Sequence, residues 1–188
     1  IPASHLHKRI FTIRQPVGVV AAITPWNFPA AMITRKVAPA LAAGCTVIIK
    51  PASQTPLTAC RIVELFAEAG VPSGVVNIIT GTRTREIGDA LLGDPRVRKV
   101  TFTGSTEVGK RIMRKAADTV KRVSLEIGEH APINEFEDAD LEKEAQEILH
   151  RKFRNAGQTC ICTNREYEQG SIAEAYVEIF TAKEKRLN

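Results

Sequence analysis

Apolar runs alternate with amphipathic stretches along the first two thirds of the chain. Five short runs have the composition of strands that are covered on both faces, with expected bounds 17–24, 45–50, 75–80, 98–103 and 121–127. Between them, apolar residues recur at helical spacing, and helices are expected over 29–43, 56–69, 84–92 and 105–117. This alternation predicts an α/β fold with a five-stranded, parallel, doubly wound sheet.

Capping and breaking residues define the ends of these helices. Asn27 is a candidate cap for the helix that begins at Pro29, and Gly44 ends that helix. Ser105 is expected to cap the fourth helix, in which apolar residues stack at i, i+4 and i+8.

The pattern changes after Gly128. A helix is expected over 140–153, and Ser171-x-x-Glu174 reads as a capping box that opens a last helix. The segments 131–136 and 162–169 are expected to be strands by their position, although they are unusually polar. This region therefore predicts a βαβα fragment.

Composition narrows the class of protein. An apolar fraction of 44% and a charged fraction of 25% are ordinary for a soluble globular chain. The net charge of +5 comes from dispersed basic residues, so a solvated surface is a better interpretation than a nucleic-acid site. No apolar run has the length of a membrane span, and the start lacks the apolar core of a signal peptide.

The four cysteines are too few for a disulfide framework, which indicates a reducing, cytoplasmic setting. Cys45 and Cys60 lie in apolar stretches and are expected in the core. Cys160 and Cys162 form a Cys-x-Cys pair without a second pair of ligands, so no metal site is expected.

In a doubly wound sheet, ligands bind beyond the carboxyl ends of the strands. Those ends are expected at 24–28, 50–53, Gly81, 103–105 and 126–128. The loops at these positions are therefore the first candidates for a binding site.

The first two loops each admit two interpretations. Asn27, held between two prolines, could donate to a developing oxyanion or could simply cap the next helix. Lys50 and Ser53 stand where dinucleotide folds often have an acid for the ribose 2′-hydroxyl, and a basic residue there tolerates a 2′-phosphate. Lys50 could equally be a surface lysine.

The later loops add a phosphate site and two reactive groups. Gly104 and Ser105 precede a helix N-terminus that could receive a phosphate, although one glycine before a capped helix is common. Glu126 could be a general base or an ordinary surface carboxylate. Cys160 could be a nucleophile or an inert loop thiol, and Cys162 could form a reversible disulfide with it.

Taken together, these motifs resemble those of the aldehyde dehydrogenase superfamily, most closely its succinate-semialdehyde dehydrogenase branch. The resemblance runs almost continuously from about Ile10 to Gln169. Five motifs occur in the family's order: Pro25-Trp26-Asn27-Phe28-Pro29, Lys50-Pro51-Ala52-Ser53, Phe102-Thr103-Gly104-Ser105, Leu125-Glu126-Ile127-Gly128 and the segment 153–160, which ends in Gly157-Gln158-Thr159-Cys160.

The resemblance implies a mechanism. Cys160 attacks the aldehyde, Asn27 and the Cys160 backbone N–H hold the oxyanion, and Glu126 activates the water that hydrolyses the thioester. Arg35 and Arg154 match the two arginines that bind the distal carboxylate of a semialdehyde, and Cys160 and Cys162 match a redox-sensitive pair.

The resemblance also implies the cofactor, which is NADP or NAD. Ser53 stands where many NAD-preferring members have Glu, so NADP is favoured. The expected cofactor-binding residues are Thr24, Pro25, Trp26, Lys50, Ala52, Ser53, Gly81, Thr103, Gly104, Ser105 and Val108.

The expected domains are an N-terminal extended segment (1–16), a Rossmann-like dinucleotide-binding domain (17–128) and part of a catalytic domain (129–188). Full-length members are homo-oligomers, and the resemblance implies that the rest of the catalytic domain lies outside this sequence. Several residues depart from the family's pattern. Glu129 stands where the family has Gly, and Glu144 stands where Ala or another small residue is expected. Asn134 and Glu135 lie in one normally apolar strand, and Glu166 and Glu168 lie beside Tyr167 in another.

The resemblance and the departures from it lead to two hypotheses. The chain is an aldehyde dehydrogenase acting on a small aldehyde, with succinate semialdehyde as the expected substrate. Alternatively, it is a truncated and resurfaced fragment that serves as a non-catalytic nucleotide-binding scaffold, with polar residues placed on newly exposed faces.

Overall fold

The computed structural model describes residues 7–187 and divides the chain into two compact units, Ile1–Ile127 and Gly128–Asn188. Each unit is described by itself below. Residues 1–6 of the expected N-terminal segment and residue 188 lie outside the described residues. No helix in the described part of the chain is long and apolar enough to cross a membrane.

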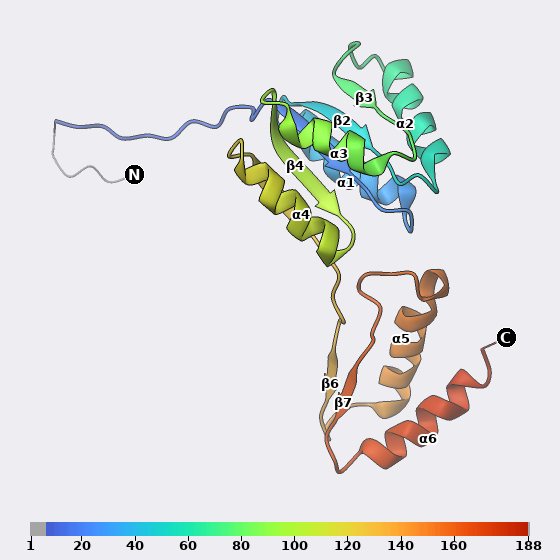
Figure 1. The fold of residues 1–188 in the computed structure, drawn as a ribbon. Helices are drawn as coiled ribbons and strands as arrows, with labels where there is room; N and C mark the ends of the chain where they lie inside the picture. Colours follow the sequence, from blue (N-terminus) through green and yellow to red (C-terminus); the bar gives the residue numbers. More distant parts are fainter. Residues whose placement is uncertain (1–6, 188) are drawn as a thin grey trace. The chain divides into compact units, whose positions relative to one another are not determined.

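The first unit is built on a five-stranded parallel sheet with the order β3-β2-β1-β4-β5 (Figure 1). The strands are β1 (Val19–Ile23), β2 (Thr46–Lys50), β3 (Val76–Ile78), β4 (Val97–Thr103) and β5 (Arg122–Glu126). This arrangement confirms the predicted α/β fold. Four of the expected strands were each one to three residues longer than the observed strand, and β4 begins one residue earlier than expected.

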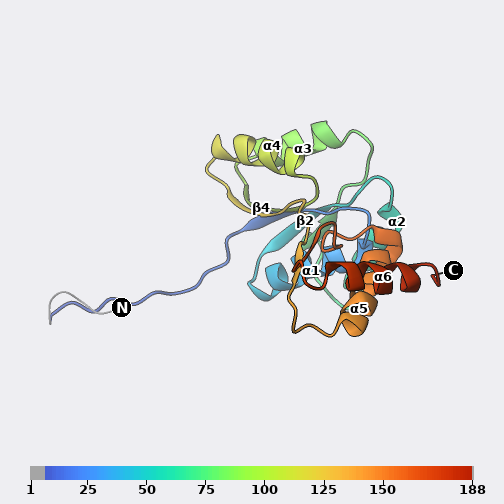
Figure 2. The same cartoon turned by 90° about the horizontal axis from the view of Figure 1, so that it is seen from below.

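Helices cover both faces of this sheet, as a parallel sheet requires. They are α1 (Pro29–Ala42), α2 (Pro56–Glu68), α3 (Thr84–Gly93) and α4 (Thr106–Ala117). Figure 2 shows α3 and α4 on one face and α1 and α2 on the other. A hydrophobic core lies on each face of the sheet, and successive residues of β1 point to opposite faces. Ala21 packs with Leu92 and Ile112, whereas Ala22 packs with Ile33 and Ala59.

Two of the predicted helix ends are confirmed. Gly44, with φ 75°, follows α1 and donates its N–H to the Leu41 carbonyl. The Ser105 hydroxyl accepts the Val108 N–H and caps α4. The prediction that Asn27 caps α1 was wrong, because the capping position is Phe28 and no side chain caps this helix.

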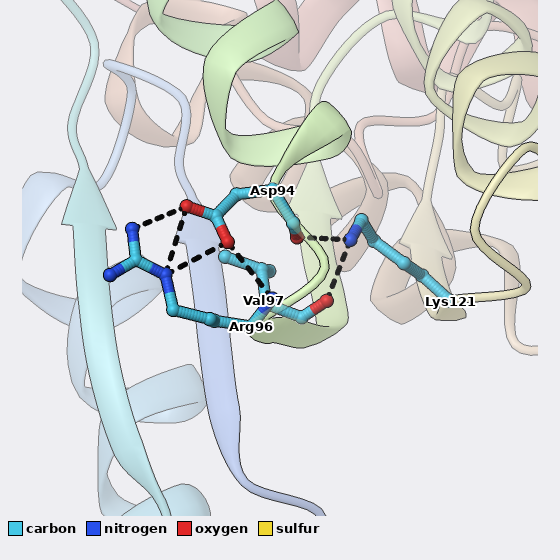
Figure 3. Close-up of polar contacts among 4 residues, drawn as sticks. All are labelled: Asp94, Arg96, Val97 and Lys121. Atoms are coloured by element: carbon cyan, nitrogen blue, oxygen red, sulfur yellow. Dashed lines mark hydrogen bonds and ion pairs between the residues drawn. The ribbon is translucent and has the colours of Figure 1, made fainter.

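Lys121 ties the start of β5 to the turn between α3 and β4 (Figure 3). Its buried ammonium group donates to the carbonyl oxygens of Asp94 at 2.6 Å and Val97 at 2.7 Å. Hydrogen bonds from the Arg96 side chain and backbone N–H lower the pKa of Asp94 to about 2. This network fixes the amino edge of the sheet, opposite the edge where doubly wound sheets bind their ligands.

The second unit contains a two-stranded parallel sheet and two helices. Its elements are β6 (Ile133–Glu135), α5 (Leu141–Phe153), the short 3-10 helix η1 (Arg154–Gly157), β7 (Glu166–Glu168) and α6 (Ala173–Glu184). The order of strands and long helices confirms the predicted βαβα fragment. Ala145, Ile148 and Tyr176 form its core.

The two helices of this unit begin differently from each other. Asp140 caps α5 by accepting the Lys143 N–H, at the predicted start. The predicted capping box of α6 was wrong, because Ile172 occupies the capping position and no side chain caps the helix. The Ser171 hydroxyl donates instead to the Glu137 carboxylate at 3.3 Å.

Candidate functional site

A cavity of about 320 Å³ opens in the first unit at the carboxyl ends of β1 and β2. Its volume lies at the lower end of the range found for small-molecule sites. Five of the predicted cofactor residues line it: Thr24, Lys50, Ala52, Ser53 and Val108. The first turns of α3 and the inner face of α4 complete the wall with residues that the sequence did not indicate, among them Thr84, Arg85, Gly88, Asp89 and Arg111.

Polar groups in this cavity are held in place by the backbone. The ammonium group of Lys50 donates to the Pro51 carbonyl at 2.7 Å, and burial lowers the pKa of this lysine. The Ser53 hydroxyl donates to the Gly81 carbonyl at 2.9 Å and so joins the loops that follow β2 and β3. The Thr24 hydroxyl is buried at the cavity and has no hydrogen-bond partner among residues 7–187.

The opposite wall carries an ion pair between α3 and α4. Arg111 donates to both carboxylate oxygens of Asp89, at 3.0 and 3.1 Å, and Lys115 lies 3.5 Å from the same carboxylate. Asp89 is the only carboxylate among the described residues that line this cavity. Its charge is therefore already balanced by two basic residues of α4.

Gly104 follows β4 at the same edge of the sheet. A Cβ atom added there would lie 2.5 Å from the ring of Phe102, so this ring closes the space that any other side chain would need. The Gly104 N–H donates to the Glu126 carbonyl, and Ser105 then caps α4. The predicted phosphate loop is thus a close-packed turn that leads directly into a helix N-terminus.

Glu126 ends β5 and is held by two neighbours. The Thr103 hydroxyl donates to its Oε2 atom at 3.0 Å, and Arg35 Nη1 lies 3.4 Å from the same oxygen. The carboxylate remains about half exposed. A predicted general base and a predicted substrate-binding arginine are therefore in contact within the first unit.

Lys36 is a nearby residue that sequence reasoning missed. It lies on α1, is buried, and donates to the Thr101 hydroxyl at 3.2 Å. Burial lowers its pKa, and the charge of Glu126 partly opposes this shift. A lysine within a helix gives no signal of burial in the sequence, since most lysines on amphipathic helices face solvent.

Cys160 belongs to the second unit and is exposed, in the loop between η1 and β7. Three successive residues of η1, from Asn155 to Gly157, have φ between 52° and 75°. This left-handed region is unfavourable for Asn155 and Ala156, so the turn before the cysteine stores backbone strain. Such strain is common at functional sites.

Cys162 is buried, unlike Cys160, and its thiol donates to the Lys152 carbonyl at 3.4 Å. Arg154, the second predicted substrate-binding residue, begins η1, and its carbonyl accepts the Thr159 hydroxyl at 3.3 Å. The second unit therefore brings Arg154, Cys160 and Cys162 into one loop region.

A group of carboxylates occupies the helix-covered face of the small sheet. Glu135 is 4% exposed with both oxygens buried, and in the parallel register it stands opposite Glu168. The nearby Tyr176 hydroxyl donates to Glu166 at 3.2 Å. Burial, followed by the charges of Glu168, Glu166 and Glu144, raises the pKa of Glu135.

The structure thus brings together some predicted site residues within each unit. In the first unit, Thr24, Lys50, Ala52, Ser53 and Val108 share a cavity, and Arg35 meets Glu126. The loops at the same edge of the sheet hold Pro25, Trp26, Asn27, Gly104 and Ser105, and Thr103 ends β4 there. Because Cys160 lies in the other unit, its meeting with Asn27 and Glu126 stays a prediction.

A cavity at the carboxyl edge of a doubly wound sheet is typical of nucleotide-dependent oxidoreductases. Comparison with known families makes the class specific, because the model of the aldehyde dehydrogenase family matches residues 1–188. The chain belongs to the aldehyde dehydrogenase family. The resemblance drawn from the motifs is therefore confirmed.

Individual relatives agree with this assignment. The succinate-semialdehyde dehydrogenase [NADP(+)] GabD of Escherichia coli K12 is 54% identical over 178 residues, which are 95% of this chain and 37% of that protein. A glutarate-semialdehyde dehydrogenase of Pseudomonas putida KT2440 is 52% identical over 187 residues, covering 100% of this chain and 39% of that protein.

A solved succinate-semialdehyde dehydrogenase from Burkholderia pseudomallei has the same fold, with a TM-score of 0.96 and 46% identity. The match covers 100% of this chain and 39% of that chain. The sequence thus spans somewhat more than a third of the length of the relatives it matches.

Proposed function

We propose that this chain provides the cofactor site, the general base and the nucleophile of an NADP-dependent dehydrogenase that oxidises a semialdehyde, with succinate semialdehyde as the substrate. The observation that carries the proposal is the cavity at the carboxyl edge of the sheet. Lys50 and Ser53 stand in it at the strand end that contacts the adenosine ribose in dinucleotide folds.

The residues of the cavity fit a nucleotide. The buried Thr24 hydroxyl borders the cavity and can bond to a ligand there. Lys50 uses one of its three ammonium protons on Pro51 and retains two for an anion. Gly104 and Ser105 would lie against the pyrophosphate at the N-terminus of α4. A nicotinamide bound here would supply the hydride acceptor that is needed to turn the thiohemiacetal of Cys160 into a thioester.

Residues of this chain carry out the other steps of the reaction. The Cys160 thiolate attacks the aldehyde carbon, and Asn27 with the Cys160 backbone N–H stabilises the oxyanion that forms. Glu126 removes a proton from the water that hydrolyses the resulting thioester. The Thr103 hydroxyl orients the Glu126 carboxylate for this step through its 3.0 Å hydrogen bond.

The substrate class follows from two arginines. Arg35 and Arg154 occupy the positions that bind the distal carboxylate in the semialdehyde branch, and an arginine fork suits a carboxylate. The names of the relatives, which include succinate-semialdehyde and glutarate-semialdehyde dehydrogenases, support an aldehyde with a distal carboxylate.

Acylation of the nucleophile tests the proposal directly. With p-nitrophenyl acetate, the chain should release a burst of p-nitrophenolate of up to one equivalent as Cys160 is acylated, and peptide mapping should locate the acetyl group there. Cys160→Ala should abolish the burst, whereas Cys60→Ala should leave it unchanged. An equal burst from wild type and Cys160→Ala would remove Cys160 from the mechanism.

The second candidate function is a non-catalytic nucleotide-binding scaffold. It is favoured by the carboxylates within the second unit. A calorimetric titration with NADP separates the two candidates when it is combined with the ester assay. Binding without acylation indicates the scaffold, and binding with acylation indicates the enzyme.

A further inference from the structure

We propose that the carboxyl groups on the helix-covered face of the small sheet form a proton-sensitive switch that controls access to Cys162. While Glu135 holds its proton, β6 and β7 stay paired and the Cys162 thiol is buried. When Glu135 releases that proton to water, the two strands separate locally and the loop that precedes β7 opens. The switch consists of residues that depart from the pattern of the aldehyde dehydrogenase family, and it does not rest on the proposed function.

Three carboxyl groups share this face of the sheet. Glu135 stands opposite Glu168 in the parallel register, and Glu166 lies two residues earlier on β7, so all three side chains point to the same side. Glu135 is 4% exposed, and both of its oxygens are buried without a hydrogen-bond partner in the part of the chain that the structure describes. A protonated carboxyl group tolerates such a place far better than an ionised one does.

The groups around Glu135 oppose its ionisation. They come from every element packed against it: Glu168 and Glu166 of β7, Glu144 of α5 and the Tyr176 hydroxyl of α6. Burial and then the three carboxylates raise the pKa of Glu135, and the Tyr176 hydroxyl, which donates to Glu166, opposes this shift. Lys152 of α5 offsets part of the charge of Glu166. The paired sheet therefore keeps the Glu135 proton to a higher pH than the open form does.

The strands that these charges would separate are short. β6 and β7 pair over three residues, and the last pair is Glu135 with Glu168. Backbone hydrogen bonds from Ile133 to Arg165 and from Gln169 to Glu135 close the two ends of the sheet. Like charges on directly opposite residues weaken strand pairing, and so small a sheet has few hydrogen bonds to resist them.

The same pairing holds the loop that carries Cys162. The Asn164 N–H donates to the His130 carbonyl at 3.1 Å and so continues the contact between the two strand segments. The Asn164 side chain accepts the Lys152 ammonium group at 3.0 Å, and the Lys152 carbonyl accepts the Cys162 thiol at 3.4 Å. Separation of the strands therefore frees Asn164 and with it the contacts that keep Cys162 at 3% exposure.

Protection of Cys162 against N-ethylmaleimide measures the switch in the 188-residue chain. A Cys160→Ala background leaves Cys162 as the one thiol of the tryptic peptide 155–165. Protection is the labelling rate in urea divided by the rate in the folded chain at the same pH, so the ionisation of the thiol itself cancels. It should fall as the pH rises from 5 to 8, by up to about tenfold per pH unit, because opening releases one proton. Cys45, which is buried in the first unit, should show no such fall.

Substitutions of single glutamates locate the cause. Glu135→Gln removes the ionisable group, so protection of Cys162 should be the same at pH 5 and pH 8. Glu168→Gln keeps Glu135 and removes the opposing charge, so the fall should be smaller than in the wild type. Glu147→Gln, on the exposed side of α5, is the matched control and should follow the wild type.

Three results would overturn the switch: a wild-type protection that does not change with pH, an equal fall in Glu135→Gln, or an equal fall at Cys45. The last result would mean that the whole chain unfolds instead of the small sheet. If Glu135→Gln does not fold, Glu168→Gln decides, and a fall as steep as that of the wild type contradicts the proposal.

Discussion

At the scale of the residue, Glu135 stands out because it places a carboxylate where a strand packs under helices. Its pKa is raised by burial, by Glu168 and Glu166 of β7, and by Glu144 of α5, while the Tyr176 hydroxyl of α6 acts in the opposite direction. The folded unit therefore holds this proton more tightly than the unfolded chain does. The stabilising contribution is complete below the unfolded pKa of about 4.3 and is lost as the pH rises through the folded pKa.

Glu135→Gln should consequently stabilise the second unit at neutral and alkaline pH. We expect a gain of about 1–3 kcal/mol at pH 8 and a much smaller gain at pH 5, since the wild-type group is protonated more often there. Thermal unfolding followed by tyrosine near-UV circular dichroism reports on this unit, because both tyrosines of the chain, Tyr167 and Tyr176, lie in it. Glu147→Gln, on the exposed side of α5, should change little at either pH.

The role of a single residue could be predicted from the sequence when it depends only on residues nearby in the chain. Ser105 was correctly expected as a cap, since capping involves only the next three residues. The burial of Lys36 and the position of Arg85 in the cavity arise from packing between distant elements, which no local pattern records. Ser171 failed as a cap because α6 begins at Ala173, with Ile172 in the capping position, and the Ser171 hydroxyl donates to Glu137, 34 residues earlier.

At the scale of the element, the α3–β4 turn and the start of β5 are held together by Lys121. Its ammonium group satisfies two backbone carbonyls at once, and burial lowers its pKa (Figure 3). The lysine thus replaces hydrogen bonds that the ends of α3 and β4 would otherwise need from water.

Lys121→Met should destabilise the first unit by about 1–3 kcal/mol, because the methionine keeps the apolar stem and leaves the two carbonyls without their donor. Urea unfolding followed by the fluorescence of Trp26, the single tryptophan of the chain, measures this change in the first unit. Lys110→Met, on the exposed side of α4, is the matched control and should shift the midpoint little. Equal midpoints for Lys121→Met and wild type would show that the network does not stabilise the sheet.

Most elements were predictable because their signals are periodic. The apolar runs of β1 and β2 reflect burial on both faces, and the helices between them carry breakers at their ends. The strands of the second unit had to be placed by position alone, since Glu135, Glu166 and Glu168 interrupt the apolar pattern. The excess length of those two predictions, 131–136 and 162–169, follows from that missing signal.

At the scale of the whole molecule, the two units carry complementary parts of one proposed reaction. The first holds the proposed cofactor cavity, Asn27, Arg35 and Glu126, and the second holds Arg154 and Cys160. That these parts meet in one site is a prediction of the proposed mechanism. Motifs predicted the chemistry of each part, but convergence depends on contacts that no motif encodes.

A crystal structure of the chain soaked with NADP tests this convergence most directly. We predict that the adenosine ribose lies against Lys50 and Ser53, and that the side chains of Asn27, Glu126 and Cys160 border the nicotinamide. A structure in which NADP occupies another surface, or in which the Cys160 sulfur lies far from both Asn27 and Glu126, would contradict the proposed dehydrogenase mechanism for this chain.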